Sequence, residues 1–318
     1  MDRNSCWISL CLVVLATMSY HRTTLAKNIT CWELPCRQNR YHFDCCIRNL
    51  EIDDGTTIES ANFARQQYIL LEDSNIYTVS PQLFQLMTDA KMLEIIGGFV
   101  PWVYLRPSLT MLTITDSQTK QIFIDPEQKK YRLIWLEVRN ITMKELPPNL
   151  NQLRDLEHIG LVDSGLEFLV MDQFDGLNKL EELNLSGNNI ARIYVNFPMR
   201  LPSLRCLQLN DNQLTAIDLS FWHMPELTTF DLSSNQLKYM AHYNSNQFDK
   251  LCAIKAERNK WNCKWLEEFL HACFHFRGYG FSERQVECDE DVEWRENCCY
   301  GNETDVGYLE YLREMQLI

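Results

Sequence analysis

Residues 204–214 read LRCLQLNDNQL, in which leucines and one asparagine follow the pattern L-x-x-L-x-L-x-x-N-x-L. The pattern recurs upstream from Leu180 to Ile190 and downstream from Leu227 to Leu237. Its period is about 24 residues, and self-similarity at such a period predicts a stack of structural repeats. The whole chain is therefore best interpreted as an array built around these three units.

The spacing inside one unit has a direct structural meaning. Leu207 and Leu209 flank a polar residue, so a short strand would point both leucines inward and Gln208 toward solvent. Asn212 would then hydrogen-bond the backbone of the following turn, because buried backbone groups need partners. The predicted fold is an α/β solenoid, a leucine-rich repeat horseshoe of about nine 24-residue repeats with cysteine-rich caps at both ends.

The predicted repeats run through most of the chain. Their first inward strand positions are Ile69, Leu93, Leu112, Leu136, Ile159, Leu183, Leu207, Phe230 and Ile254. Successive positions lie 23 or 24 residues apart, except for the 19 residues between Leu93 and Leu112. The asparagine is kept as Asn188, Asn212, Asn235 and Asn259, and is replaced earlier by Ser74, Gly98, Ser117, Ile141 and Ser164. The front half could be a separate domain, but the regular spacing favours one continuous solenoid.

The N-terminus resembles a secretory signal. Arg3 precedes an apolar run from Trp7 to Met18, which is too short to span a bilayer, and Ala26 is the expected cleavage position. No later segment has the length of a membrane span, so we expect a secreted, extracellular chain without a membrane anchor. The predicted division is 1–26 signal peptide, 27–60 N-terminal cysteine cap, 61–262 repeats, 263–300 C-terminal cysteine cap and 301–318 short tail.

The number and clustering of the cysteines also favour an extracellular location. Of the 13 cysteines, Cys6 and Cys11 would leave with the signal, and most others cluster at the two ends. Clusters that flank a repeat array in a secreted chain predict disulfide-closed caps, whose pairing the sequence leaves open. The predicted disulfide cysteines are Cys31, Cys36, Cys45, Cys46, Cys263, Cys273 and Cys288. Because eleven mature cysteines cannot all pair within one chain, at least one is free or intermolecular, and the candidates are Cys298, Cys299 and Cys206.

Glycosylation sites and net charge limit the classes of binding partner that we expect for this chain. Four N-x-S/T sequons give the predicted acceptors Asn28, Asn140, Asn184 and Asn302. The formal net charge is −13, and no basic cluster is present. An acidic chain of this kind excludes nucleic acid and anionic membrane as expected partners.

Outward strand positions predict a binding surface on the concave sheet. The first five repeats place apolar and aromatic residues there, whereas the later repeats place small polar and acidic ones. Exposed apolar strips are candidate protein contacts. The predicted partner-binding residues are Met92, Met111, Trp135, Glu137 and Arg139. The alternative is that the front half buries these side chains under a loop or a glycan.

Motifs for catalysis and cofactors are missing. His271 and His275 lie one turn apart, but Ala272 stands where the metalloprotease motif H-E-x-x-H requires glutamate. No nucleophile triad, phosphate loop or dinucleotide pattern occurs, and His158 near Asp163 is read as ordinary surface chemistry. We therefore expect no enzyme, no cofactor and no metal site.

The C-terminal cap carries a resemblance to a known family. Asn259-x-Trp261-x-Cys263, the vicinal Cys298-Cys299 pair, the signal and the 24-residue repeats together resemble the mosquito leucine-rich immune proteins. The resemblance covers nearly the whole mature chain. Long members follow the double cysteine with coiled coils, form disulfide-linked complexes and hold a complement-like thioester protein in haemolymph. This chain ends at Ile318 and so resembles a short or coil-less member.

The resemblance implies a function in insect innate immunity. It implies a recognition or scaffold protein in haemolymph that binds another leucine-rich immune protein, a complement-like thioester protein or a pathogen surface. A disulfide-linked dimer through the double cysteine is part of that expectation. An extracellular matrix or adhesion protein of the same fold, without an immune role, is the alternative.

Overall fold

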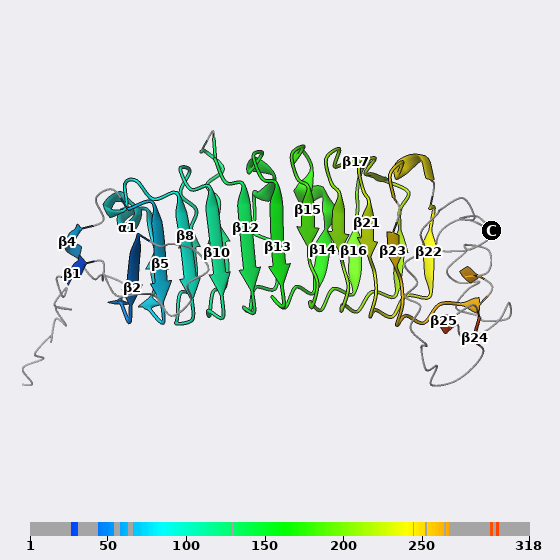
Figure 1. The fold of residues 1–318 in the computed structure, drawn as a ribbon, viewed down its shortest axis with the longest axis horizontal. Helices are drawn as coiled ribbons and strands as arrows, with labels where there is room; N and C mark the ends of the chain where they lie inside the picture. The colour runs from blue at the N-terminus through cyan, green and yellow to red at the C-terminus, as the bar shows by residue number, and fades with distance from the viewer. Residues whose placement is uncertain are drawn as a thin grey trace, which may run out of the picture.

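The computed structural model describes residues 27–30, 44–53, 58–62, 66–128, 130–243, 245–251, 253–263, 265–266, 293–294 and 297–298. Figure 1 shows an elongated body in which short parallel strands follow one another along the long axis. The predicted signal peptide, half of the predicted N-terminal cap and most of the predicted C-terminal cap lie outside the described residues. The solenoid itself is described almost completely.

The main sheet is parallel and has ten strands within the described residues. In spatial order they are β2 (Cys45–Arg48), β5 (Tyr68–Glu72), β8 (Met92–Ile96), β10 (Met111–Thr115), β12 (Trp135–Arg139), β13 (His158–Val162), β15 (Glu182–Asn184), β18 (Cys206–Gln208), β21 (Thr229–Asp231) and β23 (Ala253–Lys255). Spatial order equals chain order, so each turn of the chain adds one strand to the sheet (Figure 1). This is the predicted solenoid.

Strand register confirms the repeat spacing. Leu93 pairs with Ile69 on one side and with Leu112 on the other, and the same row continues through all nine predicted positions to Ile254. The 19-residue interval keeps this register, because the shortening is taken up outside the main sheet. One sheet and one apolar core therefore run through both the degenerate front half and the regular back half.

The return side of the solenoid consists of shorter elements. Its parallel groups are β3 (Glu51–Ile52) with β6 (Asn75–Ile76), β7 (Thr78–Val79) with β9 (Trp102–Tyr104) and β11 (Gln121–Phe123), β14 (Phe168–Val170) with β16 (Arg192–Tyr194), β17 (Met199–Arg200) with β20 (Trp222–His223), and β19 (Ala216–Asp218) with β22 (Tyr239–Ala241). Toward the ends lie β1 (Lys27–Thr30) with β4 (Ile58–Asn62) and β24 (Glu293–Trp294) with β25 (Asn297–Cys298).

Helical structure is sparse in the described part of the chain. The α-helix α1 (Pro81–Leu86) begins at Ser80, whose hydroxyl accepts the N–H of Leu83, and its first residue is a proline. This is a favourable start, because proline has no N–H to leave unpaired there. Short 3₁₀ turns replace helices elsewhere, namely η1 (Leu150–Gln152), η2 (Met171–Phe174) and η3 (Ser245–Gln247).

The asparagine positions form the predicted ladder inside the solenoid. Asn188, Asn212, Asn235 and Asn259 are buried. Each side chain donates to carbonyls of its own turn and of the preceding repeat. Each also accepts a backbone N–H from that repeat, and Asn188 accepts two. In the front half Ser74 accepts the N–H of Leu50 and donates to the carbonyl of Glu72. A serine therefore supplies part of the same bonding with a shorter side chain.

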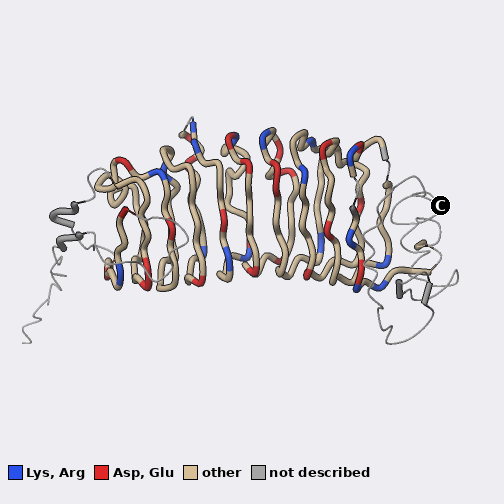
Figure 2. The backbone as a smooth tube through the Cα atoms, viewed as in Figure 1, with Lys and Arg blue, Asp and Glu red and all other residues tan. Residues whose placement is uncertain are grey.

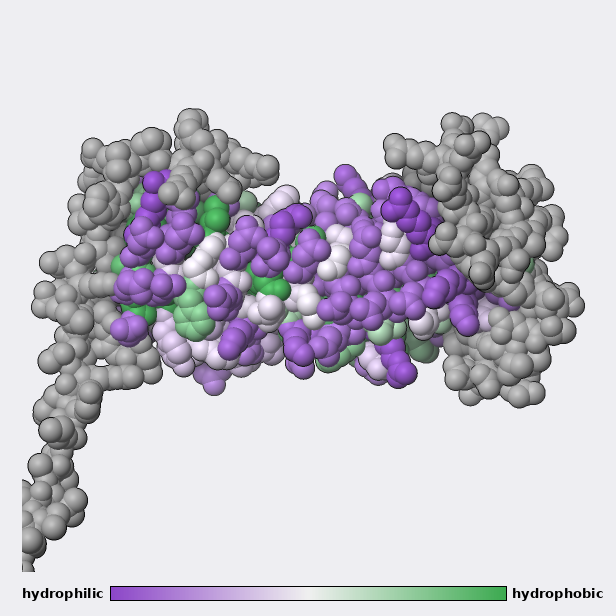
Figure 3. Space-filling view, turned by 90° about the horizontal axis from the view of Figure 1, so that it is seen from below, coloured by the Kyte–Doolittle hydropathy of each residue, from purple (hydrophilic) through white to green (hydrophobic). Residues whose placement is uncertain are grey.

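Charged side chains are distributed along both edges. Figure 2 shows acidic and basic residues interspersed over the described chain. Several pair between neighbouring repeats, as in Lys144–Glu167, Asp155–Lys179 and Lys250–Glu226. Seen from below, the surface is mostly hydrophilic, and the larger hydrophobic patches lie toward the N-terminal half (Figure 3). Such exposed pairs contribute little stability each, but their spacing follows the repeat.

Some outward positions are more buried than the alternating pattern predicts. Leu70 was expected on the exposed face, but it is fully buried, and its register neighbour Cys46 is buried as well. The outward side of the sheet is therefore buried at its N-terminal end, at Cys46 and Leu70. His158 and Gly160 in β13 are also buried, because neighbouring side chains lie over them, as described next.

Candidate functional site: the open face of the main sheet

The predicted partner-binding residues lie together on the open face, which we define as the outward side of the ten-stranded sheet. Met92, Met111 and Trp135 occupy one row on three neighbouring strands. Adjacent strands lie about 4.8 Å apart, so the row is continuous. Met92 and Met111 are half-buried, whereas Trp135 is 38% exposed. We call these three residues the apolar row.

The apolar row ends on a stacked pair. His158 follows Trp135 in the register, and the two rings lie parallel with centroids 3.6 Å apart and an interplanar angle of 10°. Stacking of this kind holds the indole ring in one orientation, and it is more favourable when the imidazole ring is charged. Trp135 is thus exposed to solvent, but its stacking on His158 restricts rotation of the indole ring.

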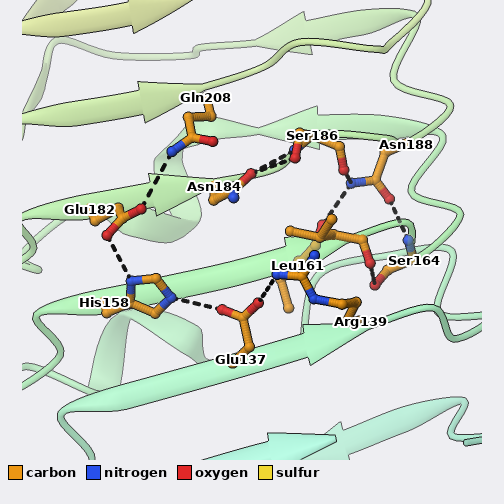
Figure 4. Close-up of polar contacts among 11 residues, drawn as sticks. Glu137, Arg139, His158, Leu161, Ser164, Glu182, Asn184, Ser186, Asn188 and Gln208 are labelled. Carbon is orange, nitrogen blue, oxygen red and sulfur yellow. Dashed lines mark hydrogen bonds and ion pairs between the residues drawn. The ribbon is translucent and has the colours of Figure 1, made fainter. Parts of the chain in front are cut away.

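Both nitrogens of the His158 ring contact carboxylates from the strands on either side. Nε2 lies 2.7 Å from Glu137 Oε2, and Nδ1 lies 3.1 Å from Glu182 Oε2 (Figure 4). Ionised carboxylates only accept hydrogen bonds, so both contacts are hydrogen bonds when both ring nitrogens carry hydrogen. The imidazole ring therefore lies between two carboxylates.

Gly160 makes the first of these contacts possible. Glu137 and Gly160 are register partners, and a Cβ atom on Gly160 would lie 1.9 Å from Glu137 Oε2. The missing side chain leaves space for the carboxylate of Glu137 to lie across β13 and reach His158. The other oxygen of Glu137 accepts a hydrogen bond of 2.8 Å from Arg139, so this carboxylate contacts both the His158 ring and the Arg139 guanidinium (Figure 4).

The polar network continues toward the C-terminal half. Gln208 Nε2 lies 3.4 Å from Glu182 Oε1 and 3.5 Å from the sulfur of Cys206. Burial raises the pKa of the Cys206 thiol, and the nearby Glu182 carboxylate acts in the same direction. Farther along, Lys255 donates to Asp231 at 3.0 Å. The charges on this face are therefore mostly balanced within the chain.

The remaining predicted sites are dispersed. Asn184 lies on the open face, where its Oδ1 accepts bonds from Ser186, and Asn140 lies in an exposed turn with positive φ. Asn28 lies in β1, and Asn302 lies outside the described residues. Cys45 and Cys263 are disulfide-bonded, whereas Cys46 does not form the predicted disulfide. Cys206 is a free thiol, and Cys298 lies in β25. Outside the described residues lie Cys31, Cys36, Cys273, Cys288 and Cys299.

The sequence missed the partners of His158. It associated His158 with Asp163, but Asp163 lies in the turn after β13, where it faces Gly187 of the next repeat. The available signal was the repeat spacing itself, because residues one period apart become neighbours on adjacent strands. Among the described residues, no group of histidine, cysteine and carboxylate side chains is arranged to hold a metal ion. No described helix is long and apolar enough to cross a membrane.

Comparison with known proteins supports the repeat assignment. The family model described as leucine rich repeat matches residues 154–214 and 190–237. The oligodendrocyte-myelin glycoprotein of Homo sapiens is 24% identical over 277 residues, which cover 82% of this chain and 54% of that protein. Leucine-rich repeat serine/threonine-protein kinase 1 of Mus musculus is 24% identical over 145 residues, which cover 43% of this chain and 7% of that protein. The chain thus spans a part of these relatives.

Solved structures show the same fold. The leucine-rich repeat domain of LRIM1 is 15% identical with a TM-score of 0.57, over 78% of this chain and 87% of that one. The LRIM1/APL1C complex matches with a TM-score of 0.51 and 12% identity, over 92% of this chain and 74% of that one. The fold therefore defines this protein as a leucine-rich repeat solenoid, a class that typically serves as a non-enzymatic binding scaffold.

Proposed function

We propose that this chain is a secreted recognition or scaffold protein of insect innate immunity that binds a protein partner through the open face. The observation that carries the proposal is the apolar row, in which Met92, Met111 and Trp135 stand side by side in register. Methionine adapts to irregular partner surfaces, and tryptophan is a frequent energetic anchor of protein interfaces.

The surroundings of the row favour binding at low entropic cost. Trp135 is exposed, yet its stacking on His158 already fixes the ring. A side chain that is ordered before binding loses little conformational freedom on binding. Arg139 remains half-exposed, with 50% of its side chain accessible beside the row. It supplies a charged group at the rim, where charges contribute to specificity and association rate.

The immune role rests on the resemblance of the C-terminal cap motif and on the likeness in fold to LRIM1 and the LRIM1/APL1C complex, which are mosquito leucine-rich repeat immune proteins. The second structure is a complex, and by analogy the partner of this chain is another leucine-rich immune protein or a complement-like thioester protein. The division into signal, caps, repeats and tail belongs to the same proposal, as does a covalent dimer through Cys298 or Cys299.

The contact is tested by pull-down from haemolymph. The purified wild-type chain is compared with a variant that combines Met92→Ala, Met111→Ala and Trp135→Ala. Trp135→Ala alone should cost roughly 2 kcal/mol or more of binding free energy, so the triple variant should recover much less partner. Thr229→Ala, a half-buried position farther along the open face, is the control and should recover the wild-type yield.

Two results would contradict the proposal. Equal recovery by the triple variant and the wild type would place the partner site elsewhere on the chain. Abundance in body fluid that does not respond to infection would favour a matrix or adhesion protein of the same fold. For the dimer, non-reducing electrophoresis should show loss of a dimer band in Cys299→Ser and not in Cys206→Ser.

A further inference from the structure

A separate cavity lies on the opposite side of the solenoid, away from the open face. Its volume is about 670 Å³, and it is bounded by α1, by the ends of β9 and β11 and by the loop at Pro148. Small-molecule sites in proteins usually have volumes of about 300–1,000 Å³. The cavity is therefore large enough for an organic ligand, and none of its lining residues belongs to the open face.

The short repeat explains why the cavity exists. Between β7 and β8 the chain has residues 80–91, which include α1, and between β11 and β12 it has residues 124–134. Between β9 and β10 it has only residues 105–110. The flanking repeats thus project beyond the short one, and the missing residues leave a notch between α1 and the 124–134 segment. The notch is a product of the 19-residue spacing.

Aromatic and apolar side chains form the walls of the notch. Tyr104 and Phe123 stack with ring centroids 4.7 Å apart and an interplanar angle of 23°. Phe84 from α1 is a third ring of the lining and is buried, and Tyr131 contributes a fourth. Flat rings and rigid prolines make a preformed apolar site that needs little ordering when a ligand enters.

Both charged groups of the notch, Arg106 and Asp125, make hydrogen bonds to the backbone of the protein. Arg106 donates hydrogen bonds to the carbonyls of Phe84 at 3.0 Å, Thr88 at 2.8 Å and Met87, so it closes the C-terminal end of α1. Burial lowers the pKa of this guanidinium. Asp125 accepts the backbone N–H of Glu127 at 2.9 Å. Four neutral amides also line the notch. Gln128 and Asn149 donate to the backbone carbonyls of Lys130 and Ile124, whereas Gln85 is exposed and Gln121 is half-buried.

We propose that this notch binds an uncharged, largely apolar small molecule with a flat ring system. The ring lies against the Tyr104–Phe123 pair, and one neutral polar group of the ligand hydrogen-bonds Gln85 or Gln121. An anionic ligand is disfavoured, because the Arg106 guanidinium, the only basic group of the lining, already donates its hydrogen bonds to the end of α1. The site is independent of the protein contact proposed for the open face.

Titration of the full chain with Nile red, an uncharged planar fluorophore, tests the site. Wild type should show a saturable increase in fluorescence. Gln85→Trp and Gln121→Trp each place an indole in the notch and should weaken binding by about tenfold or more. Gln118→Trp is the matched control, because Gln118 is exposed in a turn of the same repeat outside the cavity. It should bind like the wild type.

The outcomes separate this proposal from the preceding one. The alanine variant of the apolar row should retain Nile red binding, while the two notch variants should retain partner recovery. Thermal melting confirms that each variant is folded. The proposal is overturned if wild type shows no saturable signal, or if both notch variants bind Nile red as tightly as Gln118→Trp. Equal affinity for the anionic probe 1-anilinonaphthalene-8-sulfonate at the same site would refute the uncharged ligand class.

Discussion

A single asparagine per turn satisfies several buried backbone groups of two neighbouring repeats. Asn212 Nδ2 lies 3.0 Å from the carbonyl oxygen of Leu185 and 3.1 Å from those of Leu209 and Asn210. Its Oδ1 accepts the N–H of Ile190 at 3.0 Å. These groups lie inside the solenoid, away from water, so no solvent molecule replaces a lost bond without rearrangement. The side chain is therefore a structural crosslink between two repeats.

Replacement of Asn212 by alanine should destabilise the protein strongly for this reason. Buried carbonyls and one N–H would lose their partner, and we expect a loss of about 2–4 kcal/mol in the free energy of unfolding. Urea denaturation followed by circular dichroism measures the change. Gln213→Ala is the control, because Gln213 is exposed, and its effect should stay within about 0.5 kcal/mol. Equal effects of the two substitutions would show that the hydrogen bonds of the asparagine ladder do not stabilise the fold.

Cys206 should be a slow nucleophile although it lies on the open face. Burial raises its pKa, and the thiolate is the reactive form, so less thiolate is present at a given pH than in a free thiol. Alkylation by iodoacetamide at pH 8 should be slower than that of free cysteine, and it should accelerate as the pH rises through the raised pKa. Mass spectrometry follows the reaction, with Cys206→Ser as the blank. A rate equal to that of free cysteine would contradict the burial.

At the scale of an element, the turn after each main strand must pass close to the preceding turn. In the front half Gly98 occupies the asparagine position, with φ +75°, and a Cβ there would lie 2.1 Å from the carbonyl oxygen of Ser74. Gly165 has a similar φ of +73° but has no atom within 4 Å of a Cβ position. Glycine at position 165 is needed only for its positive φ. Glycine at position 98 is needed both for its positive φ and for the close approach of the neighbouring backbone.

This contrast predicts unequal costs for the same substitution. Gly165→Ala should cost about 1 kcal/mol, from the strain of an alanine at positive φ. Gly98→Ala should cost about 3 kcal/mol or more, because the clash is with backbone and is not relieved by rotating a side chain. Chemical denaturation of both variants gives the comparison. A Gly98→Ala variant as stable as Gly165→Ala would mean that the two turns do not approach as closely as described.

At the scale of the whole molecule, each repeat is stable only because its neighbours cover its apolar faces. The core is one cluster that extends from Cys45 near the first strand to Leu266 after the last. A defect inside one repeat therefore exposes the faces of two others. The molecule is sensitive to core changes at its centre, while its outward positions tolerate substitution.

The pair Leu207→Asp and Gln208→Asp tests this organisation with adjacent residues. Leu207 is fully buried between repeats, so an aspartate there would place an unpaired charge in the core and prevent folding. Gln208 points to the open face and is half-buried, so its aspartate variant should fold. The yield of folded chain in the medium and in cells is the measurement. Similar yields would show that the strand register is wrong.

Much of the architecture was predictable from the sequence. The nine inward positions from Ile69 to Ile254 occupy adjacent strands in one register, as their spacing predicted. The asparagine ladder and the positions of Met92, Met111 and Trp135 on the open face follow from the same period. The burial of Leu70 did not follow, because alternation within a strand assigns a side chain to a face but does not show what covers that face.

The sequence by itself determined the solenoid, because a strict period encodes which residues stack and which face inward. The tertiary structure decided what the outward residues do. His158 bonds Glu137 and Glu182 only because three parallel strands place residues from different repeats side by side, and Gly160 leaves room for one of them. The notch beside Tyr104 likewise depends on how a short repeat packs between two longer ones. Such contacts depend on side-chain directions and neighbouring volumes, which a linear pattern does not contain.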